Sequence, residues 1–213
     1  MCNMTVVNRS TDPQPVRVAI YKRPIVQNAL GTIAWRIVSL PRDASLSICT
    51  GHQYEIEAQT RSVGQFEAGS AGFVDRTHRS FENSGIDCVV ENDPQLRIVP
   101  RAIAAEAVNY GEVRVENRTR NEIWVTVMND AMPLYWPFVV LPGQIRNEDL
   151  RQPFYFAIAP AEIAPGERLD DIELLPTQTP FVDGAIAVIR GNAAAHSIEL
   201  FRNSGQDWRQ RAC

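Results

Sequence analysis

One of the three histidines, His78, has neighbours that could support nucleophilic catalysis. It lies between Asp75 and Ser80, and Ser84 is a second candidate nucleophile. A catalytic serine needs a histidine base and a third group that orients this base. Neither serine lies in the GxSxG turn that typically exposes a nucleophile. We therefore expect a solvated loop around His78, and the sequence assigns no catalytic residue.

The cysteines could bind a metal ion or form disulfides. Cys49 and His52 could supply two metal ligands, but zinc needs three or four protein ligands, and no second pair has a suitable spacing. We therefore predict no metal or cofactor site here. Cys49 and Cys88 stand in strand-like runs, which predicts two small buried apolar residues. The disulfide state of Cys2, Cys49, Cys88 and Cys213 stays open.

An acidic run in the second half of the chain could offer oxygen ligands to calcium. It contains Glu167, Asp170, Asp171 and Glu173. The run lacks the alternating Asp-x-Asp-x-Asp-Gly pattern of a dedicated calcium loop. We favour a solvated loop between strands and leave weak binding of a divalent ion to Glu167–Glu173 open.

Charge and motifs exclude several classes of partner. The formal net charge is −4 and the pI is about 5.4, whereas nucleic-acid binding relies on basic side chains that neutralise phosphates. The phosphate-binding patterns GxGxxG and GxxxxGK[ST] are absent. No signal peptide or membrane-spanning run stands out. We expect a soluble protein that is made in the cytosol, and leave leaderless export open.

Similar blocks recur in the same order in the two halves of the chain. Asn8-Arg9-Ser10 resembles Asn117-Arg118-Thr119, which lies 109 residues later. Three further pairs of blocks are centred on Trp35 and Trp136, on Tyr54 and Tyr155, and on Phe73 and Phe181. Insertions between blocks are tolerated where the blocks are joined by loops. We interpret this order as an internal duplication.

Each half has the pattern of an all-β domain. Apolar residues alternate over 16–21 and 123–128, as in strands that bury one face, and turn residues follow about every ten positions. The sequence predicts two tandem antiparallel β-sandwich domains, residues 1–104 and 105–213. Residues 102–108 are rich in helix formers and predict a connector between the copies.

Two pairs of residues that recur in the two halves are expected to have structural roles. Trp35 and Trp136 lie inside apolar runs, so we predict that both are buried anchors of the core, with a sugar-stacking platform as the alternative. Asn8 and Asn117 precede turns, where an asparagine side chain commonly bonds to nearby backbone. We therefore predict a structural role for these two asparagines.

Three classes of function remain, and the first is preferred. It is a non-enzymatic structural or interaction protein that acts through its β-sandwich surfaces, by self-association or by binding another macromolecule. The alternatives are a bivalent carbohydrate-binding protein and a hydrolase whose residues are dispersed over loops. The expected partners are a second copy, another protein or a glycan.

Overall fold

The protein is built from β-strands. The computed structural model describes residues 3–23, 32–49, 53–61, 73–82, 85–101, 111–169, 177–181 and 184–202. These residues form strands and irregular segments, which confirms the prediction of an all-β fold. No helix in this part of the chain has the length and apolar character needed to cross a membrane. The predicted connector over 102–108 lies outside the described residues.

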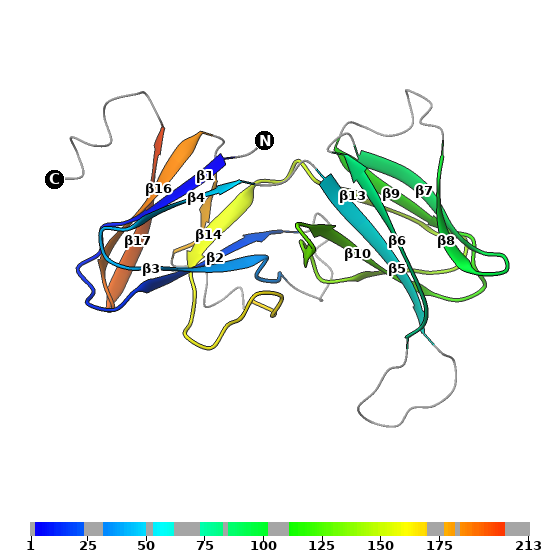
Figure 1. Cartoon of the computed structure of the whole chain (residues 1–213), viewed down its shortest axis with the longest axis horizontal. Helices are drawn as coiled ribbons and strands as arrows, with labels where there is room; N and C mark the ends of the chain where they lie inside the picture. The colour runs from blue at the N-terminus through cyan, green and yellow to red at the C-terminus, as the bar shows by residue number, and fades with distance from the viewer. Residues whose placement is uncertain are drawn as a thin grey trace. The chain divides into compact units, whose positions relative to one another are not determined.

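The first of two compact units contains two four-stranded sheets (Figure 1). One sheet has the order β17-β16-β1-β4, from β1 (Asn3–Asn8), β4 (Ser45–Cys49), β16 (Ala185–Asn192) and β17 (Ala195–Arg202). The other has the order β15-β14-β2-β3, from β2 (Val16–Lys22), β3 (Arg36–Leu40), β14 (Phe154–Ile158) and β15 (Thr179–Pro180).

The second unit has the same plan. One sheet has the order β13-β9-β7-β8, from β7 (Gly85–Asn92), β8 (Leu96–Pro100), β9 (Glu112–Asn117) and β13 (Ile145–Asp149). The other has the order β11-β10-β5-β6, with β12 also paired to β10. Its strands are β5 (Gln53–Arg61), β6 (Phe73–Glu82), β10 (Ile123–Asn129), β11 (Met132–Pro133) and β12 (Phe138–Val140).

Each unit takes strands from both halves of the chain. The first unit joins β1–β4 to β14–β17, and the second joins β5–β8 to β9–β13. The joining pairs are β1 with β16 and β2 with β14 in the first unit, and β9 with β7 and β10 with β5 in the second. The compact units therefore do not coincide with the expected ranges 1–104 and 105–213. Two of these pairs, β1·β16 and β7·β9, are parallel, so the expectation of purely antiparallel sheets is wrong.

Asn8 and Asn117 share two side-chain hydrogen bonds in the two units, and Asn117 also donates to Asn121 O. Both are fully buried at the end of a strand. The side-chain amide of Asn8 donates to Leu40 O at 2.8 Å, and that of Asn117 donates to Val140 O at 2.7 Å. Each side-chain oxygen accepts from the backbone N–H two residues later, at 2.9 and 2.8 Å. The predicted structural role of both asparagines is confirmed, and their bonds join the two sheets of each unit.

These bonds also correct the expected register between the two halves. Asn8 donates to Leu40 O, and Asn117 donates to Val140 O, so Leu40 and Val140 are equivalent residues of the two halves. These two residues are 100 positions apart in the chain. Trp35 then corresponds to Tyr135, and both are buried, whereas Trp136 is 38% exposed. The prediction of a buried anchor is confirmed for Trp35 and wrong for Trp136, because Tyr135 takes the buried position of Trp35 in the second unit.

Strand β10 buries one face, whereas β2 buries both. The alternation predicted for 123–128 is confirmed, with Ile123, Val125 and Val127 buried and the residues between them partly exposed. In β2 every residue after Arg17 is buried. The segment 159–169 packs on the second face, where Leu169 contacts the apolar cluster around Ala19 and Tyr21. The one-sided alternation expected for 16–21 is therefore wrong.

Candidate functional site

The structure does not assemble His78 with Asp75 and Ser80 as a catalytic triad. All three lie on β6, where successive side chains point to opposite faces, so Asp75 faces away from the other two. The His78 side chain is 69% exposed, and its Nε2 lies 3.7 Å from Glu55 Oε1 on the neighbouring strand. Ser84 lies outside the described residues. His78 therefore belongs to a strand and not to the expected loop.

The two candidate metal sites fall largely outside the described residues. His52, Asp170, Asp171 and Glu173 are not described. Glu167 is exposed, and its Oε2 accepts a hydrogen bond of 2.8 Å from Ala164 N. Within the part of the chain that is described, no three His, Cys, Asp or Glu side chains form a group that could hold a metal ion.

The two predicted buried cysteines have different environments. Cys49 is exposed on β4, so the prediction is wrong for this residue, which lies near the end of an edge strand. Cys88 is a free thiol and is fully buried on β7, as predicted. Burial, and secondarily the charge of Asp87, raises the pKa of Cys88 to about 12. This thiol stays protonated and unreactive at neutral pH.

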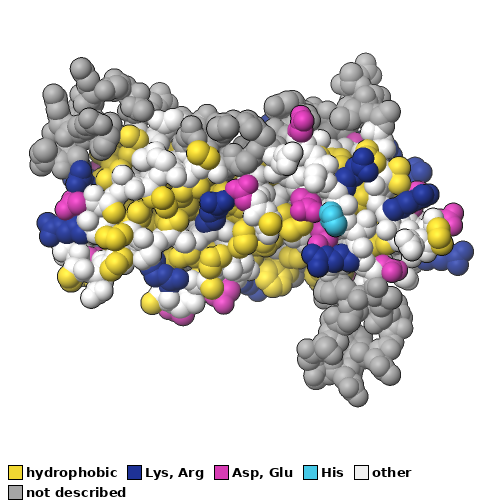
Figure 2. Space-filling view, in the orientation of Figure 1, with side chains coloured by type: hydrophobic (Ala, Val, Ile, Leu, Met, Phe, Trp, Pro, Cys, Tyr) yellow, Lys and Arg dark blue, Asp and Glu magenta, His cyan; other side chains and the backbone are white. Residues whose placement is uncertain are grey.

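The solvent face of β5 and β6 carries a cluster of charged side chains. Arg76 Nε donates to Glu57 Oε2 at 2.5 Å, beside the contact between His78 and Glu55. Figure 2 shows acidic and basic side chains and a histidine gathered over these strands. In the first unit, Tyr155 and Ala157 on β14 take the positions of Glu55 and Glu57, and they pack against residues of the segment 159–169. The two units thus present different faces from the same arrangement of strands.

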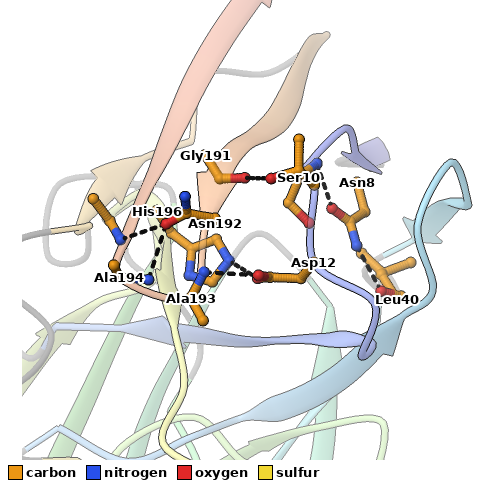
Figure 3. Close-up of polar contacts among 11 residues, drawn as sticks. Asn8, Ser10, Asp12, Leu40, Gly191, Asn192, Ala193, Ala194 and His196 are labelled. Carbon is orange, nitrogen blue, oxygen red and sulfur yellow. Dashed lines mark hydrogen bonds and ion pairs between the residues drawn. The ribbon is translucent and has the colours of Figure 1, made fainter.

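A carboxylate and an imidazole from opposite ends of the chain meet in the first unit (Figure 3). His196 Nε2 on β17 lies 2.5 Å from Asp12 Oδ2 in the loop between β1 and β2. Asp12 Oδ1 accepts a hydrogen bond of 2.7 Å from Ala193 N in the β16–β17 turn. Both side chains are nearly buried, with exposed fractions of 12% for His196 and 11% for Asp12. Asp12 therefore holds the loop against the hairpin.

A cavity of about 350 Å³ lies beside this pair. Arg17, at the start of β2, shapes the opposite wall, because its guanidinium donates to Pro160 O at 2.7 Å and to Ile163 O at 2.5 Å. The walls are mostly apolar; the lining residues are Asp12, Pro13, Gln14, Pro15, Val16, Arg17, Ile158, Ala159, Ala161, Ala193 and His196. The volume of this cavity lies in the range of small-ligand pockets. The imidazole of His196, which is oriented by its contact with Asp12, forms part of the wall.

The Asp12–His196 pair resembles the base and orienting group of a nucleophilic site. Such a site also needs a nucleophile within hydrogen-bond reach of the imidazole. The nearby Ser10 Oγ is buried and has no hydrogen-bond partner in the described part of the chain. The contacts that are present connect a loop to a hairpin, so the geometry supports a structural link more strongly than catalysis.

The second unit has no counterpart of His196. Ile189 in the first unit is equivalent to Val90 in the second unit. The carbonyl of Ile189 accepts from Arg9 N, and the carbonyl of Val90 accepts from Arg118 N. Their cross-strand partners are Ile198 and Ile98, and two residues before these partners stand His196 and Leu96. Sequence reasoning missed the pair because Asp12 and His196 are 184 residues apart and no local motif links them.

Comparison with known proteins finds no matching family model, and no curated protein or solved structure that resembles the chain significantly.

Proposed function

We propose that this is a non-enzymatic interaction protein that acts through the surfaces of two β-sandwich units, by self-association or by binding another macromolecule. The observation that supports this proposal is that all four sheets are open at both ends within the described residues. The outermost strand of an open sheet presents backbone N–H and C=O groups that another strand can pair with. Such edges suit contacts between proteins.

The repeated bonds of Asn8 and Asn117 support an internal duplication as the origin of the two units. The duplicated halves have exchanged strands, since β1 pairs with β16 and β9 pairs with β7 in the same parallel arrangement. In this proposal each half completes the sandwich of the other.

Sedimentation velocity of the purified full chain over a wide range of concentrations tests the proposal. Self-association predicts a sedimentation coefficient that rises with concentration. A monomer at every concentration, together with no binding to any protein or glycan probe, would overturn the proposal.

A carbohydrate-binding protein is a second candidate, which the exposure of Trp136 favours. The side chain is 38% exposed, and an exposed indole ring can stack on a sugar. A glycan array should then show binding that is lost in Trp136→Ala. Leu141→Ala is the matched control, because Leu141 is 45% exposed but has no ring to stack. An array without signal, or equal loss in both variants, would exclude this candidate.

A further inference from the structure

Strand β4 is an edge strand that lacks the usual protection against pairing with another strand. Among the strands that the structure describes it pairs with β1 alone, and its five residues, Ser45 to Cys49, include no charged residue and no proline. Natural edge strands are commonly protected by charge, by proline or by being very short. The other edge strands of the described sheets have at least one of these features: β3, β6, β8, β13 and β17 carry charged residues, β11 and β15 contain proline, and β12 has three residues.

The backbone of β4 is oriented for pairing at its open side. Asp43 N donates to Asn8 O and Asn8 N donates to Ala44 O, with φ of 63° at Asp43, so a β-bulge precedes the strand. From Ala44 onward, alternate residues of an antiparallel strand direct their N–H and C=O groups to opposite sides. Leu46 therefore bonds toward β1, whereas Ser45 and Ser47 direct their backbone groups outward.

The side chains of β4 leave apolar surface at the same edge. Leu46 is 38% exposed although it alternates with Ser45 and Ser47, and Ile48 on the same side of the strand is buried. A further strand beside β4 would cover Leu46. The outward groups and this side chain therefore favour the same kind of partner, an extended strand.

We propose that β4 pairs with β4 of a second copy of this chain, antiparallel and around a two-fold axis at Ser47. This inference rests on the proposed function, and names the surface and the partner. The pairing places Ser47 opposite Ser47 and Leu46 of one copy opposite Ile48 of the other. No like charges oppose one another in this pairing, because β4 carries no charged residue. The result is one continuous eight-stranded sheet across two copies.

A charge at the two-fold axis tests the proposal on the full chain. Ser47→Lys places two like charges opposite each other, and we expect at least tenfold weaker association in sedimentation velocity. Ser80→Lys is the matched control, because Ser80 is likewise an exposed serine on an edge strand, β6, where the added lysine lies opposite Glu55 and not opposite a like charge. Circular dichroism and urea unfolding verify that both variants remain folded.

A cross-link gives a second, positive measurement. In a chain with Cys2, Cys49 and Cys213 changed to serine, Ser47→Cys should form a disulfide-linked dimer on mild oxidation, since Cα atoms of a hydrogen-bonded antiparallel pair are about 5.5 Å apart. Asn147→Cys in the same background should stay monomeric.

The outcomes separate this inference from the proposed function. If the wild-type chain associates but Ser47→Lys has no effect and Ser47→Cys does not cross-link, the pairing through β4 is wrong and self-association stands. If the wild-type chain remains monomeric up to about 1 mM, at which even weak interfaces associate, both self-association and this inference are wrong.

Discussion

Asp12 and His196 are 184 residues apart in the chain, and their side chains lie 2.5 Å apart in the first unit. The contact joins the loop after β1 to the β16–β17 hairpin, so it holds together segments from the two ends of the chain. The second unit has Leu96 in the position of His196 and keeps the same strand arrangement. The link is therefore a specific feature of the first unit, and the shared arrangement of strands does not depend on it.

Replacement of His196 should lower stability. His196→Leu removes one partner of a nearly buried carboxylate, and we expect the free energy of unfolding to fall by about 1–3 kcal/mol in urea denaturation. His78→Leu is the control and should cost less than about 0.5 kcal/mol, because that side chain is largely exposed. The double variant Asp12→Asn/His196→Leu should cost less than the sum of the single changes. Equal effects of the two leucine substitutions would exclude the link.

The buried asparagines should be needed for both units. Asn8→Ala leaves Leu40 O and Ser10 N without their side-chain partner, and we expect a loss of about 2–4 kcal/mol in the free energy of unfolding. Asn117→Ala should have an effect of the same size. The exposed Asn147 is the matched control for an asparagine-to-alanine change. Unequal losses, with one variant as stable as Asn147→Ala, would contradict the structural equivalence of Asn8 and Asn117.

Because each unit contains strands from both halves of the chain, a cut between the halves should leave them associated. A protease site inserted between Ala104 and Ala105 divides the chain into two pieces, and each unit still requires strands from both. We expect the cut protein to elute from a sizing column as one species and to separate only in denaturant. Two independently eluting fragments under native conditions would contradict the pairing of β1 with β16 and of β9 with β7.

Cys88 should make stability sensitive to alkaline pH. Its pKa is raised by burial to about 12, from an ordinary value of 9.0 in the unfolded chain. Between these values the unfolded chain loses the proton and the folded chain keeps it, so the free energy of unfolding falls as pH rises, by about 1.4 kcal/mol per pH unit. Below pH 9 the contribution is constant.

Urea unfolding between pH 8 and about pH 11 measures this dependence. In Cys88→Ala, the free energy of unfolding should fall less steeply with pH than in the wild-type chain, by the contribution of one proton. The other groups that titrate at alkaline pH are common to both proteins and do not change this difference. Identical slopes would show that the Cys88 thiol ionises as easily in the folded chain as in the unfolded chain.

The strand-rich fold and the turns at the two buried asparagines could be predicted from the sequence alone. Alternating apolar residues and turn residues every ten positions predicted an all-β chain, and the buried asparagine turns at Asn8 and Asn117 followed from the preference of that side chain for nearby backbone. These features depend on interactions within a few residues, so they can be read from the chain.

The pairing of strands and the contacts between distant side chains could not be predicted from the sequence. The pairing of β1 with β16 and the contact of Asp12 with His196 join residues that no local pattern relates. Tyr135 and not Trp136 takes the buried position of Trp35, because the bonds of the two buried asparagines align Leu40 with Val140. The burial of both faces of β2 likewise depends on segment 159–169, which packs on it from the other half of the chain.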